Sequence, residues 1–113
     1  MPGCIFCDIG GERTDSEVLF RDDQCFVIRD INPEAPTHLL ILPLAHVTAL
    51  ADLGRDGEAS IGHLFAVAEE TARREAVALS GFRLVINQGP DSGQGLPHLH
   101  VHLLGGKPLP GLG

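Results

Sequence analysis

Three histidines, His98, His100 and His102, occupy alternate positions in the segment HLHVHLL near the carboxyl end of the chain. Side chains of a β-strand alternate between its two faces, so the imidazoles are expected on one face and the leucine and valine side chains on the other. Neighbours two positions apart on one face lie roughly 7 Å from each other. This spacing suits a ligand held by several imidazoles, or a nucleophilic ring with a second ring beside it. The alternative is that the three histidines serve only to pack the strand.

Strands and one helix are expected to position this segment. Alternating and apolar runs predict strands over residues 18–20, 25–29, 37–42 and 82–87, with residues 21–24 as a hairpin turn. The run 37–42 is too apolar for an edge strand and is expected to be central, and Pro43 ends it because proline donates no ladder hydrogen bond. Residues 4–9 are expected to form a short turn or helix.

The longest regular element is expected between Gly57 and Leu79. Apolar residues recur there at steps of three and four, with charged residues mostly on the other side. Gly81 is placed to follow the end of this helix. Strands, one main helix and short loops predict an α+β fold in which the helix packs on one face of a sheet. A chain of 113 residues fits a single domain over residues 1–113.

Composition and charge exclude several classes of protein. An apolar fraction of 43% excludes wholesale disorder. No apolar run approaches the roughly 20 residues of a membrane span and no basic-then-apolar leader opens the chain, so we expect a cytoplasmic protein. A net charge of −7 argues against a surface that binds duplex nucleic acid. Three cysteines leave one unpaired in any disulfide scheme, which suits a reducing compartment.

The ordered set of motifs resembles the histidine triad (HIT) family of nucleotide hydrolases and transferases, and it is most similar to the Hint branch. The resemblance extends over nearly the whole chain, through residues 4–9, 20–23, 30–38, 42–46, 87–89, 93–94 and the histidine segment with its following Gly105-Gly106. It implies an antiparallel sheet of about five strands, one long helix and a short helix. It also implies a homodimer in which the two sheets are continuous.

Cys4 and Cys7 form a CxxC pair. Alone, this spacing is compatible with a redox motif, a disulfide or two buried thiols, although the βαβ context of a redox motif does not follow. With two histidines from elsewhere, a tetrahedral Cys₂His₂ zinc site becomes credible. The resemblance implies that the ligands are Cys4, Cys7, His46 and His98. Four protein ligands leave no position for water, so the zinc is expected to be structural.

Two other potential ligands are expected to have no chemical role. Cys25 falls in an apolar strand and is interpreted as a small buried hydrophobic residue. His63 falls inside the long helix without a partner in the sequence, and is interpreted as a helix-surface histidine.

The resemblance assigns catalytic roles to three histidines. Neutral imidazole attacks phosphorus well, and the phosphorylated ring is easily hydrolysed, which gives covalent catalysis in two steps. His100, the middle histidine, would be the nucleophile, with its other nitrogen donating to a fixed acceptor such as a backbone carbonyl. His102 would donate to a phosphoryl oxygen as negative charge builds. His38 would orient the other rings, and a merely structural role for it is the alternative.

A nucleotide site is implied by the same resemblance. Asp30 is placed to accept hydrogen bonds from both ribose hydroxyls, and two amide side chains can donate to phosphoryl oxygens. Three apolar residues are expected to sandwich a purine, with plain core packing as the alternative. The implied nucleotide-binding residues are Phe6, Ile9, Ile28, Asp30, Ile31, Asn32, Asn87, Gly93 and Gln94.

Gly95 departs from the pattern of Hint relatives, which usually carry a serine there. That serine hydroxyl can help protonate the leaving group, and an amine leaves poorly without a proton. We therefore predict modest turnover of phosphoramidates and a smaller loss of rate on phosphate anhydrides, whose leaving group needs no proton.

These observations predict a nucleotide hydrolase or transferase of the HIT family. Its substrates are expected to be purine nucleoside monophosphate esters or phosphoramidates, and its intermediate a nucleotidyl-histidine. One alternative is dinucleoside polyphosphate hydrolysis by the same histidines. Another is a nucleotide-binding or scaffold protein with incidental turnover, which slow catalysis with tight nucleotide binding would favour.

Overall fold

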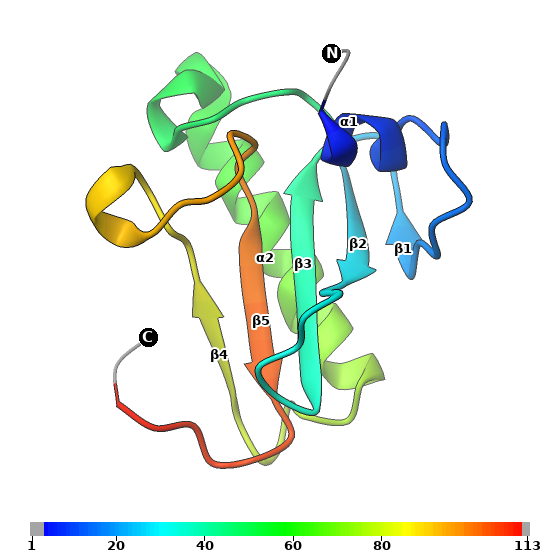
Figure 1. Ribbon diagram of the computed structural model, residues 1–113, viewed down its shortest axis with the longest axis vertical. Helices are drawn as coiled ribbons and strands as arrows, with labels where there is room; N and C mark the ends of the chain where they lie inside the picture. The colour runs from blue at the N-terminus through cyan, green and yellow to red at the C-terminus, as the bar shows by residue number, and fades with distance from the viewer. Residues whose placement is uncertain (1–3, 112–113) are drawn as a thin grey trace.

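A five-stranded antiparallel sheet forms the centre of the computed structural model, which describes residues 4–111 (Figure 1). The strands lie in the order β1-β2-β3-β5-β4, and every neighbouring pair is antiparallel. Their bounds are Phe20–Arg21 for β1, Cys25–Arg29 for β2, Thr37–Pro43 for β3, Phe82–Val85 for β4 and Val101–Gly105 for β5. The expected α+β fold with about five strands and a central strand over residues 37–42 is confirmed.

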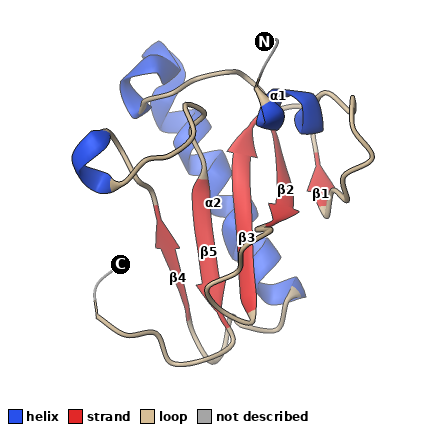
Figure 2. Ribbon diagram, in the orientation of Figure 1, coloured by secondary structure: helices blue, strands red, loops and turns tan. Residues whose placement is uncertain are grey.

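Two helices lie on opposite faces of this sheet. Helix α2, Gly57–Arg74, crosses behind the sheet in Figures 1 and 2, whereas the short helix α1, Ile5–Gly10, packs on the other face. A Cβ atom at Gly10 would lie 2.6 Å from a ring carbon of Phe26, so glycine lets α1 approach β2 closely. No helix within residues 4–111 is both long and apolar enough to cross a membrane.

The alternation of strand side chains separates the core beneath α2 from the opposite face. Leu39, Val101 and Leu103 belong to the buried cluster that contacts α2. Their neighbours of the other parity face away from α2, and the pairing of β3 with β5 places Leu40 opposite His102. Imidazoles and the helix-side core therefore occupy different faces of one sheet, as the spacing of the histidines predicts.

Helix α2 is five residues shorter than the sequence pattern predicts, because it ends at Arg74 and not at Leu79. The N–H groups of Ala76 and Val77 donate back to carbonyls of the last turn at 3.1 and 3.0 Å, and Ala76 has a φ of 61°. This is a Schellman ending with alanine in the left-handed position. The apolar periodicity continues past the ending because Val77 returns to the same core.

Strand β5 begins at Val101, so only His102 of the three histidines lies within the strand, and the expected strand over the whole histidine segment is wrong at its start. The ladder with β3 begins at Ile41 opposite Val101, and the N–H of Leu99 donates to the carbonyl of Val47 at 2.6 Å. The first strand and the strand expected over 82–87 also have shifted ends, at 20–21 and 82–85. β4 ends where its ladder with β5 ends, at Val85 opposite His102.

Candidate active site and metal centre

His100 is oriented by the backbone of its neighbour. Its Nδ1 lies 2.7 Å from the carbonyl oxygen of His98, and a carbonyl oxygen can only accept. In the neutral ring, Nδ1 therefore carries the hydrogen and Nε2 keeps its lone pair. Attack on phosphorus requires such a free nitrogen. The ring centroid lies 5.4 Å from that of Phe6 and 4.9 Å from that of His102.

His38 and His102 share a hydrogen bond whose direction the backbone sets. The N–H of Glu34 donates to Nδ1 of His38 at 3.0 Å, so the hydrogen of the neutral His38 ring is on Nε2. That nitrogen lies 2.9 Å from Nδ1 of His102 and donates to it. His102 consequently carries its own hydrogen on Nε2, from which it can donate to another group.

Burial, and after it the neighbouring rings of His100 and His38, lower the pKa of His102 from its ordinary value of 6.5 to about 4. Asp30 and Glu34 act in the opposite direction. His102 is therefore neutral at pH 7, as the hydrogen-bond chain requires. Oδ2 of Asp30 lies 3.3 Å from Nε2 of His38, farther than the 2.9 Å to His102, so the His38 hydrogen is directed mainly to His102.

Cys4, Cys7, His46 and His98 form a possible metal site, with ligand atoms that all lie within 4.8 Å of one another. Sγ of Cys4 lies 3.4 Å from Nδ1 of His98, and Sγ of Cys7 lies 3.1 Å from Nδ1 of His46. Tetrahedral zinc, with bonds of about 2.3 Å to sulfur and about 2.0 Å to nitrogen, separates its ligand atoms by roughly 3.3–3.8 Å. The four side chains therefore fit a zinc ion.

The outer hydrogen bond of His98 also suits a ligand. Its Nε2 donates to the carbonyl of Pro43 at 2.9 Å, which leaves the lone pair of Nδ1 directed at the two thiols. Histidines that bind metals usually have such an outer acceptor. Burial lowers the pKa of His98, so the ring is in the neutral form that a metal needs.

The residues expected to bind the sugar and the base fall into two groups. Asp30 follows β2, and its Oδ1 accepts the N–H of Asn32 at 2.8 Å, while Ile31 is 91% exposed. The apolar residues Phe6, Ile9 and Ile28 are buried in one cluster on the face opposite α2. Their burial agrees with core packing as well as with a wall of a base site, so both interpretations stay open.

Two amide side chains of the glycine-rich segment, residues 87–95, make hydrogen bonds that hold this segment in its conformation. Asn87 Nδ2 donates to the carbonyl of Ser92 at 2.9 Å. Gln94 donates through Nε2 to the carbonyl of Thr48 at 3.2 Å. The second hydrogen of Gln94 Nε2 is directed at the carbonyl of Leu96 at 3.4 Å, so the expected donation of the two amides to phosphoryl oxygens stays a prediction. Gly93 has a φ of 82°, which side chains rarely tolerate.

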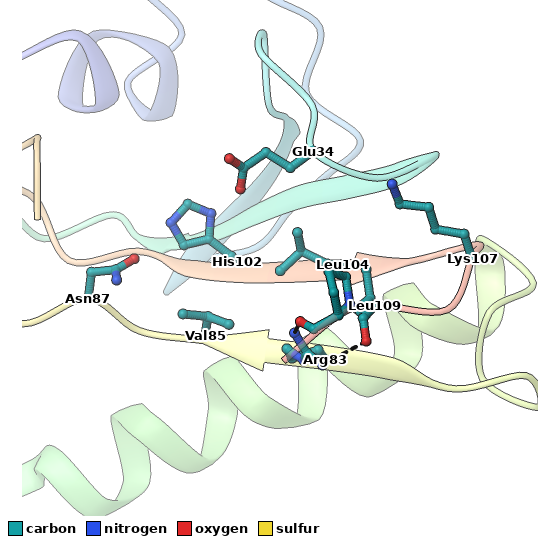
Figure 3. A pocket seen from close by; sticks show the side chains of 9 residues that line it. Glu34, Arg83, Val85, Asn87, His102, Leu104, Lys107 and Leu109 are labelled. Carbon is teal, nitrogen blue, oxygen red and sulfur yellow. Dashed lines mark hydrogen bonds between the residues drawn. The ribbon is translucent and has the colours of Figure 1, made fainter. Parts of the chain in front are cut away.

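A cavity of about 410 Å³ opens beside His102. Figure 3 shows His102 and Asn87 at one end of it and Lys107 at the other. Arg83 donates to three carbonyls of residues 109–111, so this segment is fastened as one wall of the cavity. The remaining lining residues are Glu34, Val85, Leu104, Leu109 and Pro110.

Two contacts in the structure have no local signal in the sequence. His63 does have a partner, contrary to expectation: its Nε2 lies 2.6 Å from Oδ2 of Asp22, which is 41 positions away. Glu34 contributes through its backbone N–H, which no side-chain motif reveals.

The HIT domain family model matches residues 12–109. The chain belongs to the histidine triad family. This histidine triad protein is 38% identical over 105 residues to the purine nucleoside phosphoramidase of Escherichia coli (strain K12). The matched region covers 93% of this chain and 88% of that protein. The family resemblance inferred from the motifs is thereby confirmed.

Solved structures of the family agree with this fold. A histidine triad protein from Clostridium difficile has a TM-score of 0.93 at 34% identity, with 100% of this chain and 98% of that chain covered. A zinc-bound histidine triad family protein from Mycobacterium smegmatis has a TM-score of 0.76 at 25% identity, with 93% and 76% covered.

Proposed function

We propose that this histidine triad protein hydrolyses purine nucleoside phosphoramidates and monophosphate esters through a nucleotidyl-histidine intermediate. The observation that carries the proposal is the 2.7 Å contact between Nδ1 of His100 and the carbonyl of His98, which frees Nε2 of His100 for attack. The relative from Escherichia coli, named a purine nucleoside phosphoramidase, supports the substrate class.

In the first step, Nε2 of His100 forms a bond to phosphorus while the bond to the leaving group breaks, and the departing amine or alcohol takes its proton from water. The ring becomes cationic, and its Nδ1–H bond to the His98 carbonyl stabilises that charge. His102 donates its Nε2–H to a phosphoryl oxygen as negative charge develops. In the second step, water attacks phosphorus and gives up a proton to solvent, the bond to His100 breaks so that the ring is neutral again, and the nucleoside monophosphate leaves.

Binding of the nucleotide is assigned to the residues around these rings. Asp30 accepts from the ribose hydroxyls, flanked by Ile31 and Asn32. His38 positions His102 through the 2.9 Å hydrogen bond between the two rings. Phe6, Ile9 and Ile28 contact the purine, and Asn87, Gly93 and Gln94 surround the phosphate. The cavity beside His102 provides room for the group attached to phosphorus.

Cys4, Cys7, His46 and His98 are proposed to bind a structural zinc ion. The separations of their ligand atoms and the zinc-bound relative support this assignment. Four protein ligands leave no open coordination position, so the ion, when bound, cross-links α1 to the segment that precedes β5 and takes no part in the chemistry.

The chain is further proposed to be a single domain that forms a homodimer in the cytoplasm. β4 is an edge strand, and all of its side chains are only half-buried, which leaves surface for a second copy. Three free cysteines suit a reducing compartment.

Hydrolysis of dinucleoside polyphosphates is a second candidate, favoured by Gly95. Glycine supplies no hydroxyl to protonate an amine, whereas a phosphate anhydride leaves without one. The same nucleophile serves both reactions, so the leaving group alone distinguishes them.

A quenched-reaction mass measurement tests the proposal. Wild-type protein mixed with adenosine 5′-phosphoramidate or with a diadenosine polyphosphate should gain one adenylyl group. His100→Ala should form no adduct yet still bind nucleotide, and His102→Gln should form it more slowly because charge stabilisation is lost. An adduct of undiminished yield in His100→Ala would overturn the assignment.

A further inference from the structure

A second group of potential metal ligands lies on the helix side of the sheet. Asp22 belongs to the turn between β1 and β2, Cys25 is the first residue of β2, and His63 lies in α2. A carboxylate oxygen, the thiol sulfur and an imidazole nitrogen of these residues lie within 4.8 Å of one another. Cys25 packs in the core cluster beneath α2, so this group is separate from the histidine face.

Asp22 is oriented as a ligand by its surroundings. Its Oδ1 accepts the N–H groups of Gln24 and Cys25, both at 2.8 Å, and its Oδ2 faces His63. Desolvation raises the pKa of Asp22, but these hydrogen bonds and His63 outweigh it and lower the pKa to about 2. Carboxylates that bind metals are themselves hydrogen-bonded in this way.

Cys25 is fully buried, yet its thiol lies against the carboxylate of Asp22. Burial and the neighbouring Asp22 raise the pKa of Cys25 to about 12, so the thiol keeps its proton without a cation. The side chains of Asp22 and His63 are 24% and 30% exposed, which gives a cation access. A cavity of about 230 Å³ reaches the ring of His63, although neither Asp22 nor Cys25 lines it.

We propose that Asp22, Cys25 and His63 bind one thiophilic divalent cation, Zn²⁺ or Cd²⁺, with water as the fourth ligand. Carboxylate, thiolate and imidazole together form a donor set that zinc accepts, whereas a sulfur ligand disfavours Mg²⁺ and Ca²⁺. Binding releases the thiol proton of Cys25 to solvent, and the ring hydrogen of His63 moves from Nε2 to Nδ1. Nε2 of His63 and Oδ2 of Asp22 must also separate from their present 2.6 Å to the roughly 3.3 Å between ligands of tetrahedral zinc. The cation then cross-links α2 to the β1–β2 turn.

The site is expected to fill after the Cys4-Cys7-His46-His98 cluster. It offers one thiolate and not two, and that thiol must first lose a tightly held proton. The competing possibility is a hydrogen-bonded cluster in which Asp22 and His63 simply join α2 to the turn.

Cadmium titration separates these possibilities. In a Cys4→Ser/Cys7→Ser variant, Cys25 is the only thiol, so thiolate-to-cadmium charge-transfer absorption reports on it alone. We expect saturation at one equivalent, with release of one proton. Adding His63→Gln, which keeps a donor to Asp22, should weaken binding at least about tenfold. Absence of the absorption, or a signal insensitive to His63→Gln, would overturn the proposal.

Native mass spectrometry on unmodified protein provides a second measurement, should the double variant fail to fold. With excess Zn²⁺, the wild type and the control Asp23→Asn should each carry two zinc ions, whereas His63→Gln should carry one. A wild type that stops at one ion would contradict the second site.

Discussion

The carbonyl oxygen of His98 accepts the Nδ1–H of His100 at 2.7 Å, while the Nδ1 of His98 lies 3.4 Å from Sγ of Cys4. One residue thus contributes its ring to the possible metal site and sets the tautomer of the proposed nucleophile through its backbone. Because both groups belong to His98, we expect the order of the metal site to affect the orientation of His100.

Removal of the metal is expected to lower thermal stability strongly and adduct formation moderately. A chelator releases the His98 ring, which frees its carbonyl to move away from His100, and it detaches α1 from the sheet. Elemental analysis of protein purified without added metal should find one zinc per chain. Calorimetry and the rate of adduct formation should then follow the zinc content and recover when zinc is restored. An unchanged unfolding midpoint after complete chelation would refute the structural role.

Gly95→Ser is expected to raise phosphoramidate turnover selectively, by at least about tenfold, since a placed general acid contributes about 10²–10⁴-fold. A Cβ atom at this position would meet nothing within 4 Å, and Gly95 is not among the glycines with positive φ. Rates on a phosphoramidate and on a phosphate anhydride should be compared in one assay. Gly93→Ser is the matched control: with φ at 82°, it should lower both rates through backbone strain. Equal rates in the wild type and Gly95→Ser would show that the proton comes from elsewhere.

The stability of the folded protein should fall as pH decreases from about 6.5 to about 4, in part because of His102. Its pKa is about 4 when folded and ordinarily 6.5, so the unfolded chain binds more protons across this interval. Replacing the ring by Gln removes this contribution. Urea unfolding at fixed zinc load should therefore give a shallower pH dependence for His102→Gln than for wild type. Parallel curves would argue against the buried neutral ring.

Ala76→Gly should stabilise the protein by about 0.5–1 kcal/mol. Alanine in the left-handed region costs roughly 1–2 kcal/mol, of which the greater flexibility of unfolded glycine offsets a part. Ala66→Gly, on the exposed side of α2, is the comparison and should destabilise by about 1 kcal/mol. Urea midpoints of the two variants should shift in opposite directions. A loss of stability in both would mean that the Schellman ending bears no strain.

Periodicity predicted those elements whose burial repeats along the chain. The strand over residues 25–29 has the expected bounds, and the strand over 37–42 is extended only by Pro43. The sequence did not predict the end of α2, because alanine at position 76 is not typical of a left-handed turn and Val77 prolongs the apolar pattern. The start of β5 depends on its partner strand, which a local pattern does not contain.

The candidate site likewise contains residues that the sequence predicted and contacts that it did not. The family resemblance singled out the residues of the possible metal site and the three rings proposed to be catalytic, and the fold brings each set together from separate segments. The N–H of Glu34, the carbonyls of Pro43 and His98, and the pairing of His63 with Asp22 are products of tertiary structure. The backbone groups among them fix the tautomers, so the chemistry of the rings depends on backbone positions that side-chain motifs do not reveal.

The alternation along β5 constrains how this protein can change over evolution or in design. Inserting or deleting one residue there would exchange the two faces of the strand, placing leucine where His102 lies and turning imidazole toward the core under α2. Apolar substitutions of similar volume at Val101 and Leu103 act on the opposite face from His102. The segment therefore tolerates changes of composition on one side while its length is invariant, so specificity and folding stability can be altered by separate sets of mutations.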